Sequence, residues 1–366
     1  MSDLTLDQIN ARLDQITLPD GQGLGKSERA SISVNDGRVT LAIQTRPDEA
    51  ASFSPIRDQA EALLRALPGV ASVFVVLTAE SGTKPAKTAP PDLATKPKVK
   101  ADPLADVRAV IAVASGKGGV GKSTTTVNLA LGLRALGLKV GILDADIYGP
   151  SLPTLLGLHG KPATGVGRKL KPMQAHGVRA MSMGVLVDPE TAMVWRGPMV
   201  MSAITQMMAD VDWGPLDVLL VDMPPGTGDA QLALAQGTKL AGAVIVSTPQ
   251  DLSLIDARRG ITMFRKVDVP ILGIIENMSH FICPDCGGSH AIFGQGGARA
   301  EAARLGVPFL GEVPLTMELR AASDAGTPIT ARDPHGALGQ IYTRIARTLW
   351  DGLNPTKSLS DRTAQS

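Results

Sequence analysis

The chain is poor in aromatic residues and has almost no net charge. Aromatic side chains make up 3% of the 366 residues, which argues against a surface that stacks nucleic-acid bases. The 36 basic and 35 acidic residues leave a net charge of +1, so no overall field attracts nucleic acid or an acidic membrane. We therefore expect no nucleic-acid partner and no membrane partner.

Long apolar segments are also missing. No apolar run is long enough to cross a bilayer, and the first residues do not join a basic segment to an apolar one, as an export signal would. The sequence therefore predicts a cytoplasmic protein. With 44% hydrophobic residues, a chain of this length has enough apolar material for two domains.

The most informative segment is 116–124, which matches the phosphate-loop pattern G-x-x-x-x-G-K-[ST]. The apolar run 110–114 predicts a buried strand before it, and residues 123–136 predict a helix after it. Glycines let the backbone N–H groups surround phosphate oxygens, Lys122 can neutralise the β- and γ-phosphates, and Ser123 can hold magnesium. The predicted ATP-binding residues of this loop are Gly116, Lys117, Gly118, Gly119, Val120, Gly121, Lys122, Ser123 and Thr124.

Polar residues follow three further apolar segments. Asp144 and Asp146 come after the segment 140–143. Asp222 comes directly after the segment 217–221, and Asn277 follows the segment 271–275. Because parallel strands open at the same edge of a sheet, these side chains are expected near the phosphate loop. The fold class predicted is α/β, with a mostly parallel, doubly wound sheet of the P-loop NTPase type.

Lys117 adds a cation directly after the first glycine of the loop, which makes the loop resemble that of the signature-lysine ATPases. This superfamily includes the nitrogenase iron protein, the division-site and chromosome-partition ATPases, and the Mrp/ApbC iron–sulfur carriers. The resemblance implies that two subunits close over two nucleotides and that Lys117 reaches the partner's phosphates. It also implies that Asp146 orients or deprotonates the attacking water, while Asp144 supports Asp146 and the metal.

The same resemblance assigns two other residues. Asp222 looks like the Walker B acid, which binds the magnesium shell, and the Pro-Pro-Gly turn at 224–226 resembles the switch II loop. Asn277 stands where these ATPases place an asparagine amide against adenine. Its alternative role is simply to cap a turn.

The chain has only two cysteines, Cys283 and Cys286, in the sequence Cys-Pro-Asp-Cys-Gly. A close C-x-x-C pair is typical of redox or metal-binding chemistry. Two chains would together supply four thiolates, the ligand set of a [4Fe-4S] cluster. With the segments 277–279 and 293–294, the motif resembles the Mrp/ApbC family. This implies a homodimer that carries a [4Fe-4S] cluster to apoproteins and works with cluster-assembly proteins.

Spacing alone leaves alternatives open at the cysteines. His280, Cys283, Cys286 and His290 could enclose zinc within one chain, or the thiols could form a metal-free redox pair. The competing function is a ParA/MinD-like positioning ATPase that acts on membrane or DNA and has a structural zinc site. Division-site ATPases dock on membranes through a C-terminal helix, but the apolar stripe over 338–349 favours core packing here.

The chain divides into four predicted regions: a small α/β domain over 1–80, a Pro/Lys-rich linker over 81–103, the ATPase domain over 104–353 and a polar tail over 354–366. The order of elements in the first resembles the iron–sulfur-assembly domain often fused to these carriers. Homologous domains often have a reactive cysteine near the second helix, where this chain has Ser54-Pro55. We therefore expect partner docking from this domain.

Overall fold

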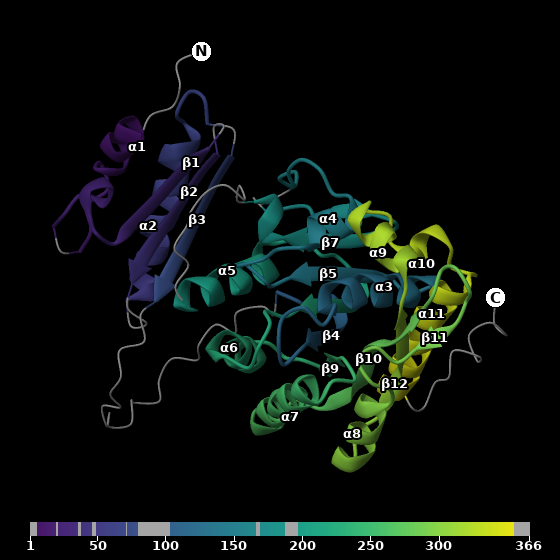
Figure 1. Ribbon diagram of the computed structural model, residues 1–366. Helices are drawn as coiled ribbons and strands as arrows, with labels where there is room; N and C mark the ends of the chain where they lie inside the picture. Colours follow the sequence, from purple (N-terminus) through teal and green to yellow (C-terminus); the bar gives the residue numbers. More distant parts are fainter. Residues whose placement is uncertain are drawn as a thin grey trace. The chain divides into compact units, whose positions relative to one another are not determined.

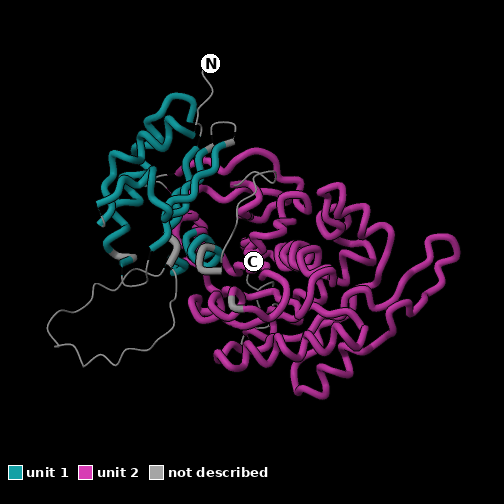
Figure 2. Tube along the Cα trace, turned by 60° about the vertical axis from the view of Figure 1, so that its left-hand side comes forward, with its two compact units in different colours: residues 1–105, 187–206 teal, residues 106–186, 207–366 magenta. Residues whose placement is uncertain are grey.

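The structure is a computed structural model that describes residues 6–19, 21–35, 38–45, 49–70, 72–79, 103–165, 169–186 and 197–354. The chain separates into two compact units (Figure 2): residues 1–105 with 187–206, and residues 106–186 with 207–366. Residues 81–102 of the predicted linker and 355–366 of the predicted tail lie outside the described residues.

The first unit is a small α/β domain. Its elements are α1 (Leu6–Leu13), β1 (Ala30–Asn35), β2 (Arg38–Thr45), α2 (Ala50–Arg65) and β3 (Ser72–Ala79). The strands form a sheet in the order β1-β2-β3, with β1 antiparallel and β3 parallel to β2. Apolar residues from both helices and the sheet, such as Ile9, Leu41 and Leu64, are fully buried in one core. Along the chain the order is helix, hairpin, helix and strand.

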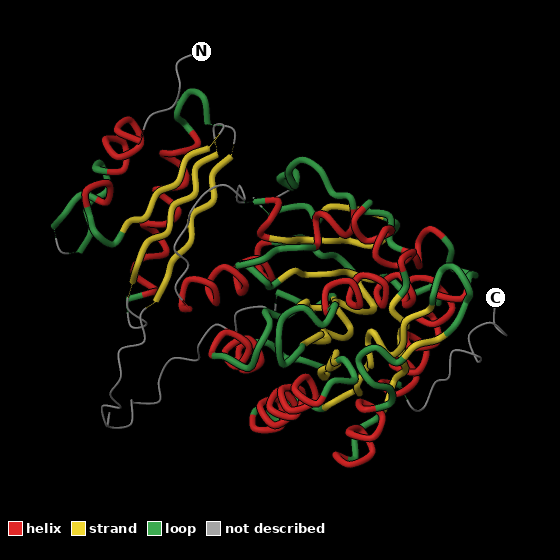
Figure 3. Tube along the Cα trace, in the orientation of Figure 1, coloured by secondary structure: helices red, strands yellow, loops and turns green. Residues whose placement is uncertain are grey.

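The second unit is organised by a mixed, mostly parallel sheet (Figures 1 and 3). Among the described residues its strands are β4 (Val107–Ala114), β5 (Val140–Asp144), β6 (Met173–Ala175), β7 (Val178–Ser182), β8 (Leu216–Asp222), β9 (Gly242–Ser247), β10 (Ile271–Ile282), β11 (Ser289–His290) and β12 (Phe309–Leu315). Their order is β11-β10-β9-β4-β8-β5-β7-β6, and β12 pairs with β10. Only β6 and β11 run antiparallel to their partners within the described part of this sheet.

Helices cover this sheet. They are α3 (Lys122–Ala135), α4 (Leu152–Leu156), α6 (Asp229–Gly237), α7 (Asp251–Lys266), α8 (Gly297–Leu305), α9 (Met317–Asp324), α10 (Ile329–Arg332) and α11 (Ala337–Leu353). Helix α5 (Gly197–Asp210) is divided between the two units, with residues 197–206 in the first. Helices α3 and α11 lie side by side over one apolar cluster, while α7 packs on β9 and α8 on β10 (Figure 1). Leu338, Tyr342, Ile345 and Leu349 of α11 are buried in that cluster, so the stripe over 338–349 packs in the core, as predicted.

The sheet brings the predicted functional segments to one edge. Central strand β4 leads into the phosphate loop, its neighbour β8 ends at Asp222, and the next strand, β5, ends at Asp144. The register pairs Asp222 with Val113 on one side and with Asp144 on the other. The fold class is therefore as the sequence predicted. One boundary differs: residues 187–206 group with the first unit, where Gln206 Nε2 donates to the Val75 carbonyl at 3.2 Å.

Candidate functional site

The phosphate loop has the tight conformation that its glycines predict. Gly119 and Gly121 have φ angles of 80° and 76°, in the left-handed region that favours glycine. A Cβ on Gly121 would also lie 2.3 Å from Asn277 Nδ2, so a larger residue cannot occupy this position without displacing Asn277. Helix α3 starts at Lys122, directly after this turn, so its first N–H groups face the loop.

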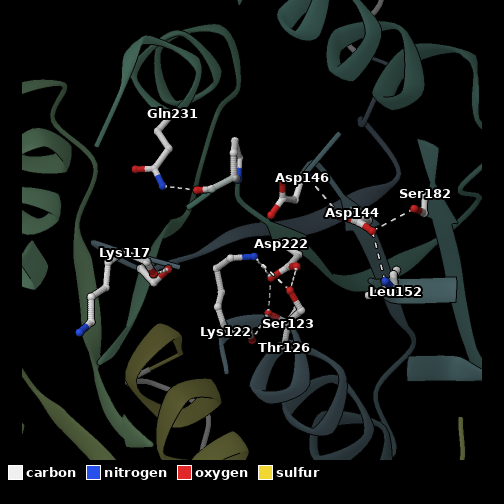
Figure 4. A network of polar contacts seen from close by, with 12 residues as sticks. Lys117, Lys122, Ser123, Thr126, Asp144, Asp146, Leu152, Ser182, Asp222 and Gln231 are labelled. Carbon is white, nitrogen blue, oxygen red and sulfur yellow. Dashed lines mark hydrogen bonds and ion pairs between the residues drawn. The ribbon is translucent and has the colours of Figure 1, made fainter. Parts of the chain in front are cut away.

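Lys122, Ser123 and Asp222 form a buried polar cluster (Figure 4). Lys122 Nζ lies 2.8 Å from Asp222 Oδ1, and the two side chains are 6% and 0% exposed. Ser123 Oγ donates to Asp222 Oδ2 at 2.5 Å. A hydroxyl beside a carboxylate is the oxygen donor set that Mg²⁺ prefers, so Ser123 and Asp222 fit the predicted metal. The charges of Lys122 and Asp222 compensate each other.

A cavity of about 250 Å³ opens over this cluster. It is lined by the loop residues and by side chains from three other segments, namely Ser115, Lys117, Gly118, Gly119, Val120, Gly121, Lys122, Ser123, Thr124, Asp146, Ser151, Leu155 and Pro225. The structure therefore brings the predicted loop residues other than Gly116 together with Asp146 around one space.

The two acids after β5 have different surroundings. Asp146 lies on the cavity wall, and burial raises the pKa of its carboxyl, although nearby Lys122 opposes this shift. Asp144 is only 1% exposed and is not among the described lining residues. Burial, reinforced by the charge of Asp222, raises the pKa of Asp144 to about 7. The support that Asp144 gives to Asp146 and the metal stays a prediction.

Lys117 points away from the buried cluster of its own chain (Figure 4). Its Nζ atom lies 3.5 Å from Gln250 Oε1, at the edge of hydrogen-bond distance. The side chain is thus held only weakly, and its role toward a partner's phosphates stays a prediction.

Asn277 contacts the loop itself. Its Nδ2 atom donates to the Val120 carbonyl at 2.8 Å, and the side chain is 5% exposed. The adjacent Met278 has a φ of 55°, and a register shift in β10 follows between Asn277 and Phe281. The adenine role given by resemblance stays a prediction. In this structure the amide ties β10 to the phosphate loop.

The two cysteines lie in the turn between β10 and β11. These strands pair Ile282 with Ser289, and the Cys283 N–H donates to the Gly288 carbonyl at 2.9 Å across the turn. Both thiols are free, and Cys286 is exposed. Backbone N–H groups of Cys286 and Asp285, with a smaller contribution from the Cys286 thiol, lower the pKa of Cys283. The turn therefore offers two accessible sulfur ligands.

The four residues of the zinc alternative are all described, but they do not assemble. Among the residues that the structure describes, no three His, Cys, Asp or Glu side chains come together in a group that could hold a metal ion. His280 Nδ1 instead lies 3.0 Å from Ser279 Oγ. A complete zinc site within one chain would require a rearrangement of this hairpin.

Three polar residues of the site were not identified from the sequence. Thr126 Oγ1 lies 2.8 Å from Asp222 Oδ1, Ser182 Oγ donates to Asp144 Oδ2 at 2.9 Å, and Gln231 Nε2 donates to the Pro224 carbonyl. Thr126 follows Lys122 by four residues, a spacing that places both on one helix face and could have revealed it. Ser182 carries no such signal, because its partner Asp144 lies 38 positions away. Gln231 lies seven positions after Pro224, but no motif marks the pair.

Comparison with known proteins agrees with this geometry. Residues 106–350 match the family of NUBPL iron-transfer P-loop NTPases, and residues 6–75 match the iron–sulfur cluster assembly protein family. The chain belongs to the NUBPL iron-transfer P-loop NTPase family. The Mrp/ApbC-type resemblance and the small assembly-type domain are thereby confirmed.

Individual members of the family cover most of the chain. The Arabidopsis thaliana "Iron-sulfur protein required for NADH dehydrogenase, mitochondrial" is 52% identical over 263 residues, which is 72% of this chain and 84% of that protein. The "Iron-sulfur cluster carrier protein" of Escherichia coli K12 is 52% identical over 257 residues, 70% of each chain.

A solved structure places a nucleotide on the same fold. The nucleotide-binding protein from Archaeoglobus fulgidus, solved in complex with ADP, is 42% identical to this chain and has a TM-score of 0.55. The match covers 62% of this chain and 89% of that one.

Within the described residues, no helix is both long and apolar enough to cross a membrane.

Proposed function

We propose that this protein is a homodimeric ATPase that carries a [4Fe-4S] cluster as cargo on Cys283 and Cys286 of two chains and passes it to apoproteins. The observation that carries the proposal is the pair of accessible, free thiols in the β10–β11 turn of an iron-transfer P-loop NTPase. One chain has two thiols, and a cubane cluster takes four thiolate ligands, so two chains complete the set.

The phosphate site supports hydrolysis of ATP to ADP and phosphate. The loop N–H groups and Lys122 would hold the phosphates, and Ser123 with Asp222 would hold Mg²⁺. The metal ion supplies positive charge to the phosphate oxygens when bound. Asp146, on the cavity wall, would orient the attacking water and accept its proton, a role that a raised pKa favours.

The position of Lys117 supports a second subunit at the site. Its amine points away from Lys122 and lies 3.5 Å from Gln250 Oε1, a long contact. A cation held this loosely can reach phosphates that a partner chain presents. Dimerisation would then complete the nucleotide site and the cluster site together.

Strand β10 offers a connection between the two sites. Asn277 near its middle touches the phosphate loop, and its last residue, Ile282, precedes Cys283. A nucleotide that moves the loop would therefore also act on the strand that carries the thiols.

We expect the protein to work in the cytoplasm and to deliver clusters to iron–sulfur client proteins, with cluster-assembly proteins as further partners.

The test is anaerobic reconstitution with iron and sulfide, followed by counts of iron, sulfide and zinc per chain and by native mass. We expect about four iron and four sulfide per dimer, as four cysteine ligands require, and none in Cys283→Ala/Cys286→Ala. Asp285→Ala is the matched control, since it changes an exposed side chain of the same turn and leaves both thiols; it should keep the cluster. One zinc per chain, bound without iron and without dimerisation, would contradict the proposal.

A further inference from the structure

Ser182 lies at the end of β7, outside every recognised motif, and is completely buried. Its Oγ atom accepts a hydrogen bond from the Gly184 N–H at 3.0 Å and donates to Asp144 Oδ2 at 2.9 Å. Because the Gly184 N–H occupies one lone pair of the hydroxyl, the serine cannot rotate freely and its hydrogen is directed at the carboxylate. Ser182 thus fixes the orientation of Asp144.

Asp144 in turn holds both ends of the loop 145–151. Its Oδ1 atom accepts from the Asp146 N–H at 3.1 Å, and its Oδ2 atom accepts from the Leu152 N–H at 3.3 Å. Asp146 near the start of this loop and Ser151 at its end both line the nucleotide cavity. One buried carboxylate therefore sets the path of the segment that forms this part of the cavity wall.

The chain after Ser182 also supports the loop by shape. A Cβ on Gly184 would lie 3.0 Å from Pro150 Cβ and 3.2 Å from Pro153 Cγ. These separations are tighter than ordinary side-chain contacts, so the two prolines pack directly against the backbone of Gly184. The end of β7 and the turn after it support the loop in two ways. One is the polar contact through Asp144, and the other is the apolar contact through Gly184.

We infer that Ser182 is a positioning residue for hydrolysis, which acts through Asp144 to hold the loop that carries Asp146. The inference rests on the proposed ATPase function and extends it to a strand that does not line the cavity. If the inference holds, a change at Ser182 should affect the rate of hydrolysis more than the affinity for nucleotide. The reason is that the phosphate loop and Lys122 do not depend on β7 for their contacts.

The experiment compares Ser182→Ala, Ser182→Thr and Gly184→Ala in the full chain. ATP hydrolysis gives kcat and KM, calorimetry gives the Kd for ADP, and hydrogen exchange reports the backbone N–H groups of residues 145–152. Thr330→Val is the matched control, because it also removes a buried hydroxyl, which lies 3.0 Å from Asn128 Oδ1. As with Asp144 in Ser182→Ala, the oxygen that loses this contact still accepts a hydrogen bond from a backbone N–H, here that of Thr330.

We expect Ser182→Ala to lower kcat about tenfold, the effect of losing one hydrogen bond to a buried carboxyl group, with KM and the Kd for ADP changed less than about twofold. The N–H groups of Asp146 and Leu152 should exchange faster. Ser182→Thr, which keeps the hydroxyl, should restore both readouts, and Gly184→Ala should lower kcat by displacing Pro150. Thr330→Val should leave kcat and exchange in the loop unchanged.

Two results would overturn the role of Ser182: unchanged exchange in Ser182→Ala, or faster exchange with an unchanged kcat. A wild-type protein that binds ADP but hydrolyses no ATP would instead refute the proposed ATPase. Hydrogen exchange needs no hydrolysis, so it would still show whether Ser182 holds the loop.

Discussion

The phosphate site and the cysteine turn differ in how far one chain completes them. Lys122 and Asp222 are buried and 2.8 Å apart, and Ser123 and Thr126 contact the same carboxylate. In the cysteine turn, Cys286 is exposed, both thiols are free, and no third metal-ligating side chain joins them among the described residues. The first site is held together by its own contacts, whereas the second offers two thiols and, among the described residues, no further metal ligand.

This difference matches what each site has to do under the proposed function. A phosphate site that is already ordered loses little entropy when nucleotide binds, so binding energy remains for the reaction. A cargo site must release what it holds, and accessible thiols at the end of a hairpin allow another protein to approach. Dimerisation would then matter far more for cluster binding than for nucleotide binding, and this difference can be tested.

The largest effect is expected at Lys117, which under the proposed function reaches the phosphates of the partner chain. Lys117→Ala should lower kcat about 10³-fold, the range seen when a cation supplied by a partner is removed from phosphoryl transfer. Its amine contacts Gln250 Oε1 only at the long distance of 3.5 Å, so stability and ADP binding should stay as in the wild type. Hydrolysis per chain should also rise with protein concentration. A rate per chain that is independent of concentration would show that one chain suffices.

The buried ion pair gives the next largest effect. Lys122→Met leaves Asp222 buried and without its cation, which should lower the free energy of unfolding by about 3 kcal/mol and abolish nucleotide binding. Urea unfolding and ADP calorimetry measure the two effects.

The double variant Lys122→Met/Asp222→Asn separates stability from binding. It removes both charges, so it should regain most of the lost stability while still failing to bind ADP. If Lys122→Met were as stable as the wild type, the compensation of charge between the two residues would not contribute to the fold.

The phosphate site could be predicted from the sequence because its residues follow a local pattern. A loop of fixed spacing, a strand before it and acids at the ends of further strands were enough to place Lys122, Ser123 and Asp222 together. Individual contacts that no motif marks could not be found in this way. Ser182 holds Asp144 across 38 positions, and the contact from Asn277 to Val120 spans 157.

The cysteine turn shows a different limit of the sequence. Its position after β10 and its ligand type follow from the motif, but the choice between iron–sulfur and zinc does not follow from spacing. The structure adds that His280 and His290 do not join the thiols within one chain, and the family match adds iron transfer. Under the proposed function, the ligand set that forms depends on a second chain, and neither one sequence nor one chain contains that information.

A smaller effect is expected from Asn277, which links the two regions. Asn277→Ala removes a buried donor and leaves the Val120 carbonyl without this partner, which should weaken ADP binding about tenfold. Cluster content after reconstitution should be unchanged, because the thiols are untouched. If ATP and ADP alter the rate of cluster transfer in the wild type, that difference should shrink in Asn277→Ala. Ser279→Ala, a buried change two residues along β10, is the control and should keep the difference.

The smallest effect concerns the chemistry of Cys283 in the native turn. Its pKa is lowered because backbone N–H groups stabilise the thiolate, so alkylation by iodoacetamide should reach half its maximal rate below about pH 8.5, the ordinary thiol value. Mass spectrometry of the modified peptide, resolved by residue, measures this midpoint.

In urea the backbone donors are lost, so the midpoint of Cys283 alkylation should rise. Asp285→Ala should leave it unchanged, since its backbone N–H remains. Equal midpoints in native and unfolded protein would show that the turn does not prepare this thiol. A lower native midpoint would mean that the exposed turn, although it lacks half of its ligands, already holds one of them closer to the charge state that iron requires.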